Sequence, residues 1–198
     1  MERKLIKFLQ CPNCSGKFSL KTKNNSGTNV RDGQLFCKCS KYNIKNSLPM
    51  ILPRKPNNMD EWDDQWNLYS SKIKLWDTDI DEWENNMIKE HLLLNDATEL
   101  KKKWVLDAGC GPGLVSARLS KYCVGGGLIG VDMSKAAQFA EAHFHSSPRS
   151  SKLYNNLHFV QADLLKLPFK SETFDIVYSA GVIHHIEETE LAFKNLLR

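Results

Sequence analysis

The amino-acid sequence predicts an α/β protein in which a doubly wound parallel sheet follows a small metal-binding module. Strand-like apolar runs alternate with helical patterns from Lys101 onward, and this alternation is typical of parallel sheets. A glycine-rich turn separates the first of these strands from the first helix, where such sheets bind ligands. Four of the six cysteines fall within the first 39 residues, which indicates a module with its own metal chemistry.

The composition is that of an ordinary globular protein. Among the 198 residues, 41% are hydrophobic and 25% are charged. No apolar run approaches the ~18 residues of a membrane span, and the charged start, Met1–Lys7, is unlike a secretory signal peptide. The sequence therefore predicts a cytoplasmic protein.

The charges are unevenly spread along the chain. Residues 1–56 hold 12 Lys and Arg residues against 2 acidic residues, whereas residues 57–198 hold 15 against 21. This asymmetry indicates two modules and permits an acidic partner such as RNA for the first. A solvated basic face on a small domain explains the same charges without a partner.

Residues 1–53 are predicted to form the metal-binding module. Their cysteines come as two close pairs, Cys11 with Cys14 and Cys37 with Cys39. In a cytoplasmic chain such pairs indicate metal ligands rather than disulfides, and four thiolates suit a closed, structural zinc site. A module this small buries little core, so the metal would supply much of its folding energy. The alternative is a module that has lost its metal.

Residues 54–100 are predicted to form a linker and a helical cap. Pro53 and Pro56 bracket the start of the linker. Aromatic and apolar residues then recur at helical spacing: Trp62, Trp66 and Tyr69 on one face, and Trp83, Met87 and Leu94 on a second helix, Asp79–Leu94. Such a stripe either packs on the core or covers a ligand site.

Residues 101–198 carry the alternating pattern. The predicted strands are Trp104–Ala108, Leu128–Asp132, Leu157–Ala162 and Phe174–Ala180. The predicted helices are about Leu114–Lys121, Lys135–Phe144 and Glu188–Leu197. Ligands bind at the carboxyl ends of parallel strands, and Asp107, Asp132 and Asp163 stand at three of these ends. Each acid alone could instead cap a helix.

The glycine turn has the pattern D-x-G-x-G-x-G, from Asp107 to Gly113. It differs from the dinucleotide pattern G-x-G-x-x-G, because Leu114 stands where the third glycine belongs. A carboxylate at Asp107 would repel a pyrophosphate but suits the ammonium group of an amino-acid moiety. A dinucleotide site and a purely structural turn remain the alternatives.

The stretch Trp104–Gly113 resembles the first motif of class I S-adenosylmethionine-dependent methyltransferases of the type 11 group. The resemblance implies a Rossmann-like sheet and S-adenosyl-L-methionine as cofactor. It also implies binding roles along the cofactor. The methionine end would be held by Asp107, Gly109, Gly111 and Gly113, the ribose by Asp132 beside Met133, and the adenine by Asp163 and the backbone of Leu164.

A second stretch, Phe174–Ile186, resembles the F-D-x-V-x-x-x-x-V-x-H-H segment of small-molecule and lipid-quinone methyltransferases. The resemblance implies a small-molecule, glycan or lipid-metabolite substrate. His184 or His185 could accept the substrate's proton, because imidazole titrates near neutral pH. Alternatively, one histidine packs under the cofactor and the other is solvated.

The N-terminal module resembles the zinc ribbon related to the methyltransferase activator Trm112. The shared features are the C-P-x-C knuckle, the second cysteine pair and the closing stretch Tyr42–Pro53. The second knuckle departs from the family, because it reads C-x-C rather than C-x-x-C. The basic ribbon makes a tRNA or rRNA methyltransferase the second functional hypothesis.

The sequence ends at Arg198, where the methyltransferase family continues with a P-G-G turn and further strands. The resemblance therefore predicts a truncated domain with strand order 3-2-1-4 and the strand Phe174–Ala180 at an open edge. An open apolar edge favours association with itself or with a partner. A non-enzymatic remnant that binds a partner is the third hypothesis.

Overall fold

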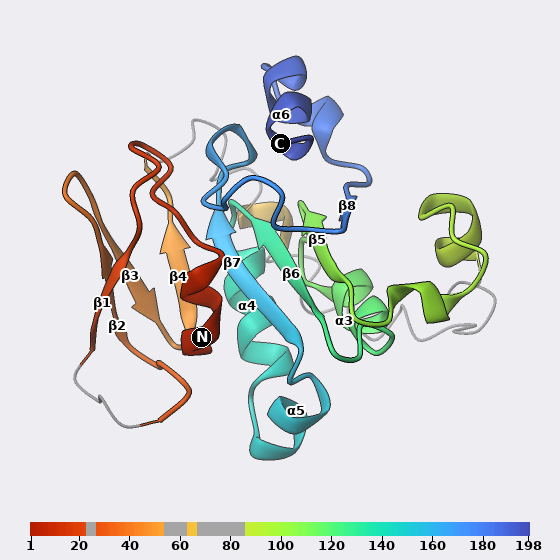
Figure 1. Cartoon of the computed structure of the whole chain (residues 1–198), viewed down its shortest axis with the longest axis horizontal. Coiled ribbons are helices and arrows are strands. Elements are labelled where there is room, and N and C mark those ends of the chain that lie inside the picture. Colours follow the sequence, from red (N-terminus) through yellow and green to blue (C-terminus); the bar gives the residue numbers. More distant parts are fainter. Residues whose placement is uncertain (23–26, 54–62, 67–85) are drawn as a thin grey trace.

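The computed structural model describes residues 1–22, 27–53, 63–66 and 86–198. Within these ranges an eight-stranded mixed sheet has the order β1-β2-β3-β4-β7-β6-β5-β8 (Figure 1). Its strands are β1 (Ser19–Thr22), β2 (Gly33–Phe36), β3 (Lys41–Lys45), β4 (Leu48–Ile51), β5 (Trp104–Ala108), β6 (Gly127–Asp132), β7 (Leu157–Ala162) and β8 (Ile176–Tyr178). The predicted α/β class is confirmed.

Strands β7, β6, β5 and β8 are parallel and reproduce the predicted order 3-2-1-4. The bounds of β5 and β7 match the prediction, and β6 begins one residue earlier. Strand β8 is shorter than predicted, because its flanking residues make other contacts. The Phe174 ring packs on Phe169 at 5.0 Å between centroids, and the Asp175 carboxylate accepts the Trp104 N–H at 2.8 Å.

Helices cover both faces of the parallel strands. On one face α3 (Leu114–Ser120) and α4 (Ala136–Phe144) pack on β6 and β7. On the other face lie η1 (Arg3–Lys7), η5 (Leu164–Lys166) and α6 (Thr189–Leu196). A short helix, α5 (Pro148–Leu153), was not predicted; the Ser147 side chain caps it and proline occupies its first turn.

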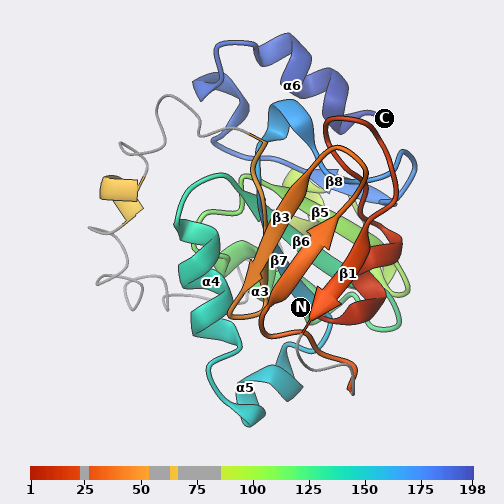
Figure 2. The same ribbon diagram turned by 90° about the vertical axis from the view of Figure 1, so that its left-hand side faces the viewer.

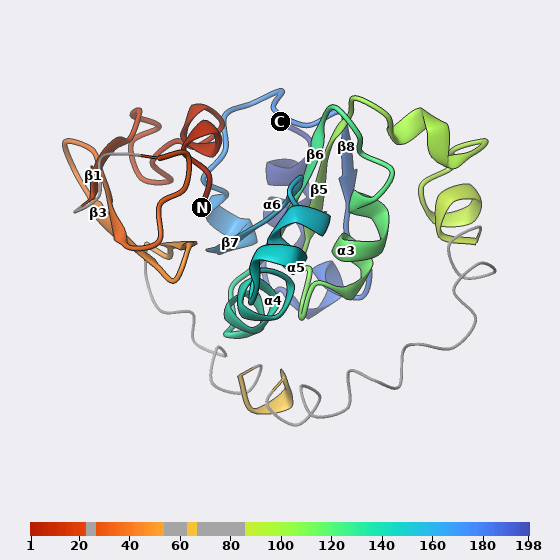
Figure 3. The same ribbon diagram turned by 90° about the horizontal axis from the view of Figure 1, so that it is seen from below.

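The N-terminal strands extend the parallel sheet, with β1 and β3 at one end and β8 toward the other (Figures 2 and 3). Strand β4 runs parallel to β7, where Ile51 is paired with Ala162. A second connection joins residues 8–10 to residues 168–170 through Gln10 N to Pro168 O at 2.8 Å and Lys170 N to Phe8 O at 3.0 Å. The predicted domain boundaries at residues 53 and 100 stay predictions. The sheet, however, contains strands from both sides of residue 53.

Little of the predicted helical cap lies within the described ranges. Trp62, Tyr69, Trp76 and Trp83 fall outside them, whereas residues 63–66 form a helical turn. The predicted helix to Leu94 is wrong at its C-terminal end. A π-helical turn, η3 (Met87–His91), stops at Leu92, and Leu93 has a left-handed φ of 56°. A 3₁₀ turn, η4 (Ala97–Leu100), then leads into β5.

The far edge of the described sheet is β8, as the predicted strand order required. Val177 on this strand is 39% exposed, and the C-terminal segment exposes Leu191 and Phe193 on α6 and Leu197 directly after it. In the part of the chain that the structure describes, every helix is too short or too polar to cross a bilayer.

Candidate cofactor site and metal centre

The glycine turn lies between β5 and α3 and is fixed to the neighbouring strand. The backbone N–H groups of Gly109 and Cys110 both donate to Val131 O, at 2.7 and 2.9 Å. Gly113 has φ of 78°, and a Cβ built there would lie 2.6 Å from the Phe159 ring. Glycine is therefore required at 113 both by the left-handed backbone and by close packing on β7.

Asp107 is 3% exposed at the carboxyl end of β5. Its Oδ2 accepts a hydrogen bond of 2.6 Å from Ser116 Oγ on α3. Burial raises the pKa of Asp107 to about 6, the Ser116 hydrogen bond opposes this, and the nearby Asp132 charge adds to it. A cation placed here would favour the charged carboxylate, which fits the ammonium group expected from the sequence.

Asp132 connects the glycine turn to the loop after β6. Its Oδ2 accepts the Gly111 N–H at 2.9 Å, and its Oδ1 accepts both Ser134 N–H at 2.9 Å and Ser134 Oγ at 2.6 Å. A carboxylate has about four acceptor positions, so capacity remains for a hydroxyl of a ligand. The structure thus places Asp132 beside the glycine turn. This was expected, because both lie at the carboxyl ends of parallel strands.

Asp163 is 5% exposed and caps a short helical turn. Its Oδ1 accepts the Leu165 N–H at 2.9 Å and begins η5, which contains the buried Leu164. The capping role that the sequence left open for this acid is therefore present. A ligand contact by Asp163 would use its second oxygen.

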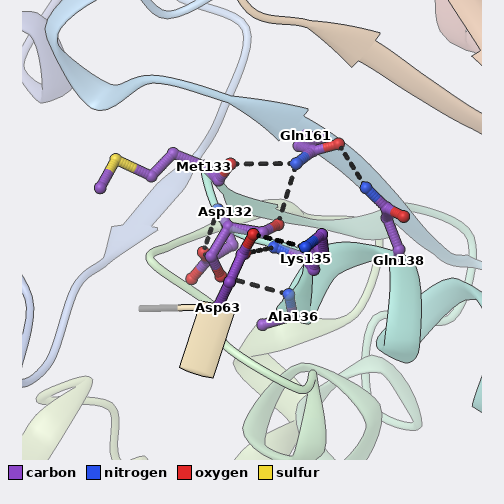
Figure 4. A network of polar contacts seen from close by, with 8 residues as sticks. Asp63, Asp132, Met133, Lys135, Ala136, Gln138 and Gln161 are labelled. Atoms are coloured by element: carbon purple, nitrogen blue, oxygen red, sulfur yellow. Dashed lines mark hydrogen bonds and ion pairs between the residues drawn. The ribbon is translucent and has the colours of Figure 1, made fainter. Parts of the chain in front are cut away.

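Gln161 was not singled out from the sequence, yet it organises the loop after β6 (Figure 4). Its Nε2 donates to Met133 O at 3.0 Å and Ser134 O at 3.1 Å, and its Oε1 accepts from Gln138 at 3.1 Å. A glutamine within the mostly apolar strand β7 was the available signal, because a buried amide needs partners.

The histidine loop lies against the glycine turn. A Cβ built on Gly109 would come within 2.3 Å of the Val182 side chain, and Ser179 Oγ donates to Ala108 O at 2.8 Å. His184 and His185 follow in η6 (Ile183–His185), both exposed, with ring centroids 4.0 Å apart. Their role as proton acceptors stays a prediction.

The four N-terminal cysteines converge on one point. Their Sγ atoms all lie within 4.8 Å of one another, with Cys11–Cys39 at 3.6 Å, Cys14–Cys37 at 3.7 Å and Cys37–Cys39 at 3.5 Å. A tetrahedral zinc ion with Zn–S bonds of ~2.3 Å has sulfur–sulfur edges of roughly 3.8 Å. The C-x-C spacing therefore still allows a four-sulfur site.

The first knuckle is built to hold a thiolate. Cys11 N donates to Gly16 O at 2.9 Å and Ser15 N donates to Cys11 O at 2.8 Å. Burial opposes ionisation of Cys11, but hydrogen bonds from the Asn13 and Cys14 backbone outweigh it and lower the pKa of Cys11 to about 6. All six cysteines are free, so the donor set fits a metal better than disulfides.

Comparisons with known proteins agree with this fold. Residues 106–198 match the family model described as a methyltransferase domain. An uncharacterized methyltransferase of Schizosaccharomyces pombe is 34% identical over 96 residues, which cover 48% of this chain and 34% of that protein. A malonyl-[acyl-carrier protein] O-methyltransferase of Legionella pneumophila is 30% identical over 94 residues, which cover 48% of this chain and 31% of that protein. The chain spans about a third of the length of these two relatives.

Solved structures share the fold. A candidate S-adenosyl-L-methionine-dependent methyltransferase of Methanococcus maripaludis superposes with a TM-score of 0.52 at 19% identity, over 73% of this chain and 60% of that one. The fold is thus the Rossmann-like α/β fold of S-adenosylmethionine-dependent methyltransferases. Residues 106–198 carry the match to the methyltransferase domain itself.

Proposed function

We propose that this chain is an S-adenosyl-L-methionine-dependent methyltransferase that acts on a small molecule or a glycan or lipid metabolite. One observation carries the proposal. A buried Asp107, a glycine turn and an Asp132 bonded to Gly111 meet at the carboxyl ends of two adjacent parallel strands. This is where open α/β sheets bind ligands, and the methyltransferase-domain match covers the same residues.

The order of the strands supports an extended cofactor pose. Asp107, Asp132 and Asp163 end or follow β5, β6 and β7, which are adjacent in the sheet. Neighbouring strands lie ~4.8 Å apart, so the three acids span a length suited to a nucleoside joined to an amino acid. Asp107 with Gly109, Gly111 and Gly113 would hold the amino-acid end, Asp132 and Met133 the ribose, and Asp163 and Leu164 the adenine.

The cofactor supplies a sulfonium methyl group that is already activated for transfer. The chain's own contribution is then to hold the acceptor in line and to exclude water. His184 or His185 would take a proton from an acceptor hydroxyl or amine. The four cysteines would bind zinc as a structural ion, because four thiolates leave no open position.

Titration with S-adenosylhomocysteine tests this proposal. We expect one binding site per chain in calorimetry and loss of binding in Asp132→Asn, because its side-chain NH2 group cannot accept hydrogen bonds in place of a carboxylate oxygen. Folded protein that binds no S-adenosylhomocysteine below millimolar concentration contradicts the proposal. Binding of NADH in its place would support the dinucleotide alternative.

The substrate class rests on the His184–His185 loop and on the relative named as a malonyl-[acyl-carrier protein] O-methyltransferase. A second candidate is RNA, favoured by the exposed basic side chains on the N-terminal module. These are Lys17, Lys21, Arg31, Lys38, Lys41 and Lys45. Phosphate contacts release counterions, so RNA affinity that stays constant between low and high salt would count against this candidate.

A further inference from the structure

Asp63 is a buried carboxylate that comes from outside the parallel sheet. Its side chain is 4% exposed, and it contacts Lys135, 72 residues away in sequence (Figure 4). Oδ1 accepts the Lys135 backbone N–H at 2.7 Å, and Oδ2 lies 3.0 Å from Lys135 Nζ. A carboxylate at the start of α4 satisfies a free N–H group and complements the helix dipole.

Three consecutive N–H groups at this helix start are each satisfied by a different side chain. Ser134 N donates to Asp132 Oδ1 at 2.9 Å, Lys135 N to Asp63 Oδ1 at 2.7 Å, and Ala136 N to Ser134 Oγ at 3.2 Å. Asp63 therefore shares one short stretch of backbone with Asp132. The Asp132 carboxylate is thus hydrogen-bonded to the same stretch that Asp63 holds.

The same helical turn also reaches the glycine turn. Trp66 lies three residues after Asp63, and a Cβ built on Gly111 would come within 2.8 Å of the Trp66 ring. Gly111 in turn donates its N–H to Asp132 Oδ2 at 2.9 Å. Residues 63–66 thus contact both the loop after β6 and the glycine turn, and Asp132 bridges these two.

We propose that Asp63 is a positioning residue for the nucleoside end of the cofactor, acting through Lys135 on Asp132. The inference rests on the proposed function, because it takes Asp132 as the ribose acceptor. Without Asp63, the Lys135 ammonium and N–H group lose this carboxylate, and the adjoining Ser134 backbone, which donates to Asp132, loses its support. Asp132 then leaves Gly111, and Trp66 loses the anchor that seats it on the glycine turn.

The test compares S-adenosylhomocysteine binding by four proteins in calorimetry. Asp63→Ala removes both contacts, and we expect binding at least about tenfold weaker than wild type, in line with loss of a charged hydrogen bond. Asp63→Asn still accepts the Lys135 N–H, and we expect about threefold weakening from the lost ion pair. Asp64→Asn is the matched control, because Asp64 is exposed, and it should bind like wild type.

A second measurement separates positioning from a loss of general stability. A 2′-deoxyribose analogue of S-adenosylhomocysteine lacks one hydroxyl that Asp132 would accept, so it should lose much less affinity on Asp63→Ala than the natural ligand does. This coupling is the signature of two groups acting on one contact. Equal losses for both ligands would overturn the inference.

The outcomes also separate the inference from the proposed function. Wild-type protein that binds no S-adenosylhomocysteine contradicts the proposed function itself. If the wild type binds S-adenosylhomocysteine and both Asp63 variants bind it equally well, only the proposed role of Asp63 is contradicted. If Asp63→Ala fails to fold, Asp63→Asn and Lys135→Met carry the same comparison, because both keep the backbone cap at Lys135.

Discussion

Binding of the cofactor's amino-acid end should depend on pH through Asp107. Burial, aided by the Asp132 charge, raises the pKa of Asp107 to about 6. The ammonium group of the cofactor favours the charged form of Asp107. At a pH below this pKa, Asp107 must therefore lose a proton when the ligand binds. Asp107 would be roughly nine-tenths charged at pH 7 and one-tenth charged at pH 5 in the free protein. We therefore expect S-adenosylhomocysteine to bind about tenfold more weakly at pH 5 than at pH 7.

Calorimetry at pH 5, 6 and 7 measures this effect, and buffers of different ionisation enthalpy count the protons released. Adenosine is the matched control ligand, because it lacks the amino-acid end and should bind equally at each pH. Ser116→Ala removes the hydrogen bond that lowers the pKa of Asp107, so it should move the transition to higher pH. Constant affinity for S-adenosylhomocysteine, or the same pH dependence for adenosine, would refute the reasoning.

The same pKa predicts the sign of a stability effect. Asp107 has a folded-state pKa above the ordinary value of an aspartate. The unliganded protein therefore gains stability from this residue when it is protonated. That contribution is complete below about pH 4 and is lost as the pH rises through about 6.

Three further predictions concern the rest of the chain. Purified protein should carry about one zinc ion, and Cys14→Ser should remove it and lower the melting temperature; metal-free wild-type protein with the same melting temperature would contradict this. Ile51→Ala should destabilise the whole chain by about 2–5 kcal/mol in one unfolding transition, because Ile51 is fully buried where β4 meets β7; two separate transitions would show independent modules. Replacing His184 and His185 by Gln should leave S-adenosylhomocysteine affinity unchanged, because both are exposed, and should lower turnover about 100-fold if one accepts the proton; a change in affinity instead would place them in the cofactor site.

The parallel strands could be predicted from the sequence because their signal is local. Strands β5, β6 and β7 are short apolar runs with an acid at or next to their last residue, and the glycine turn marks where the first helix begins. Parallel strands buried on both faces give continuous apolar runs. Their carboxyl ends meet at one edge, so the convergence of Asp132 on the glycine turn followed from the order of the elements.

The pairing of β4 with β7 could not be predicted in this way. It joins Met50 to Gln161 and Ile51 to Ala162, and such a long-range contact leaves no periodicity in either segment. The same is true of Asp63, whose charge and position in a polar stretch indicate an exposed residue. Its burial depends on the start of α4, a partner that only the folded chain brings near.

The capping role of Asp163 shows a different limit. An acid after a strand has the same sequence pattern whether it binds a ligand or begins a helical turn. The structure shows the second role through the Leu165 N–H, and leaves the first to experiment. How many hydrogen bonds this carboxylate accepts from the protein itself depends on its surroundings in the fold, and its position in the sequence does not reveal them.

A crystal structure of this chain with S-adenosylhomocysteine bound tests the central claim most directly. We expect the amino-acid end at the glycine turn near Asp107, the ribose hydroxyls within hydrogen-bonding distance of Asp132, and the adenine beside Asp163 and Leu164. A ligand bound elsewhere on the fold, or a nucleoside that makes no contact with Asp132, would contradict the account.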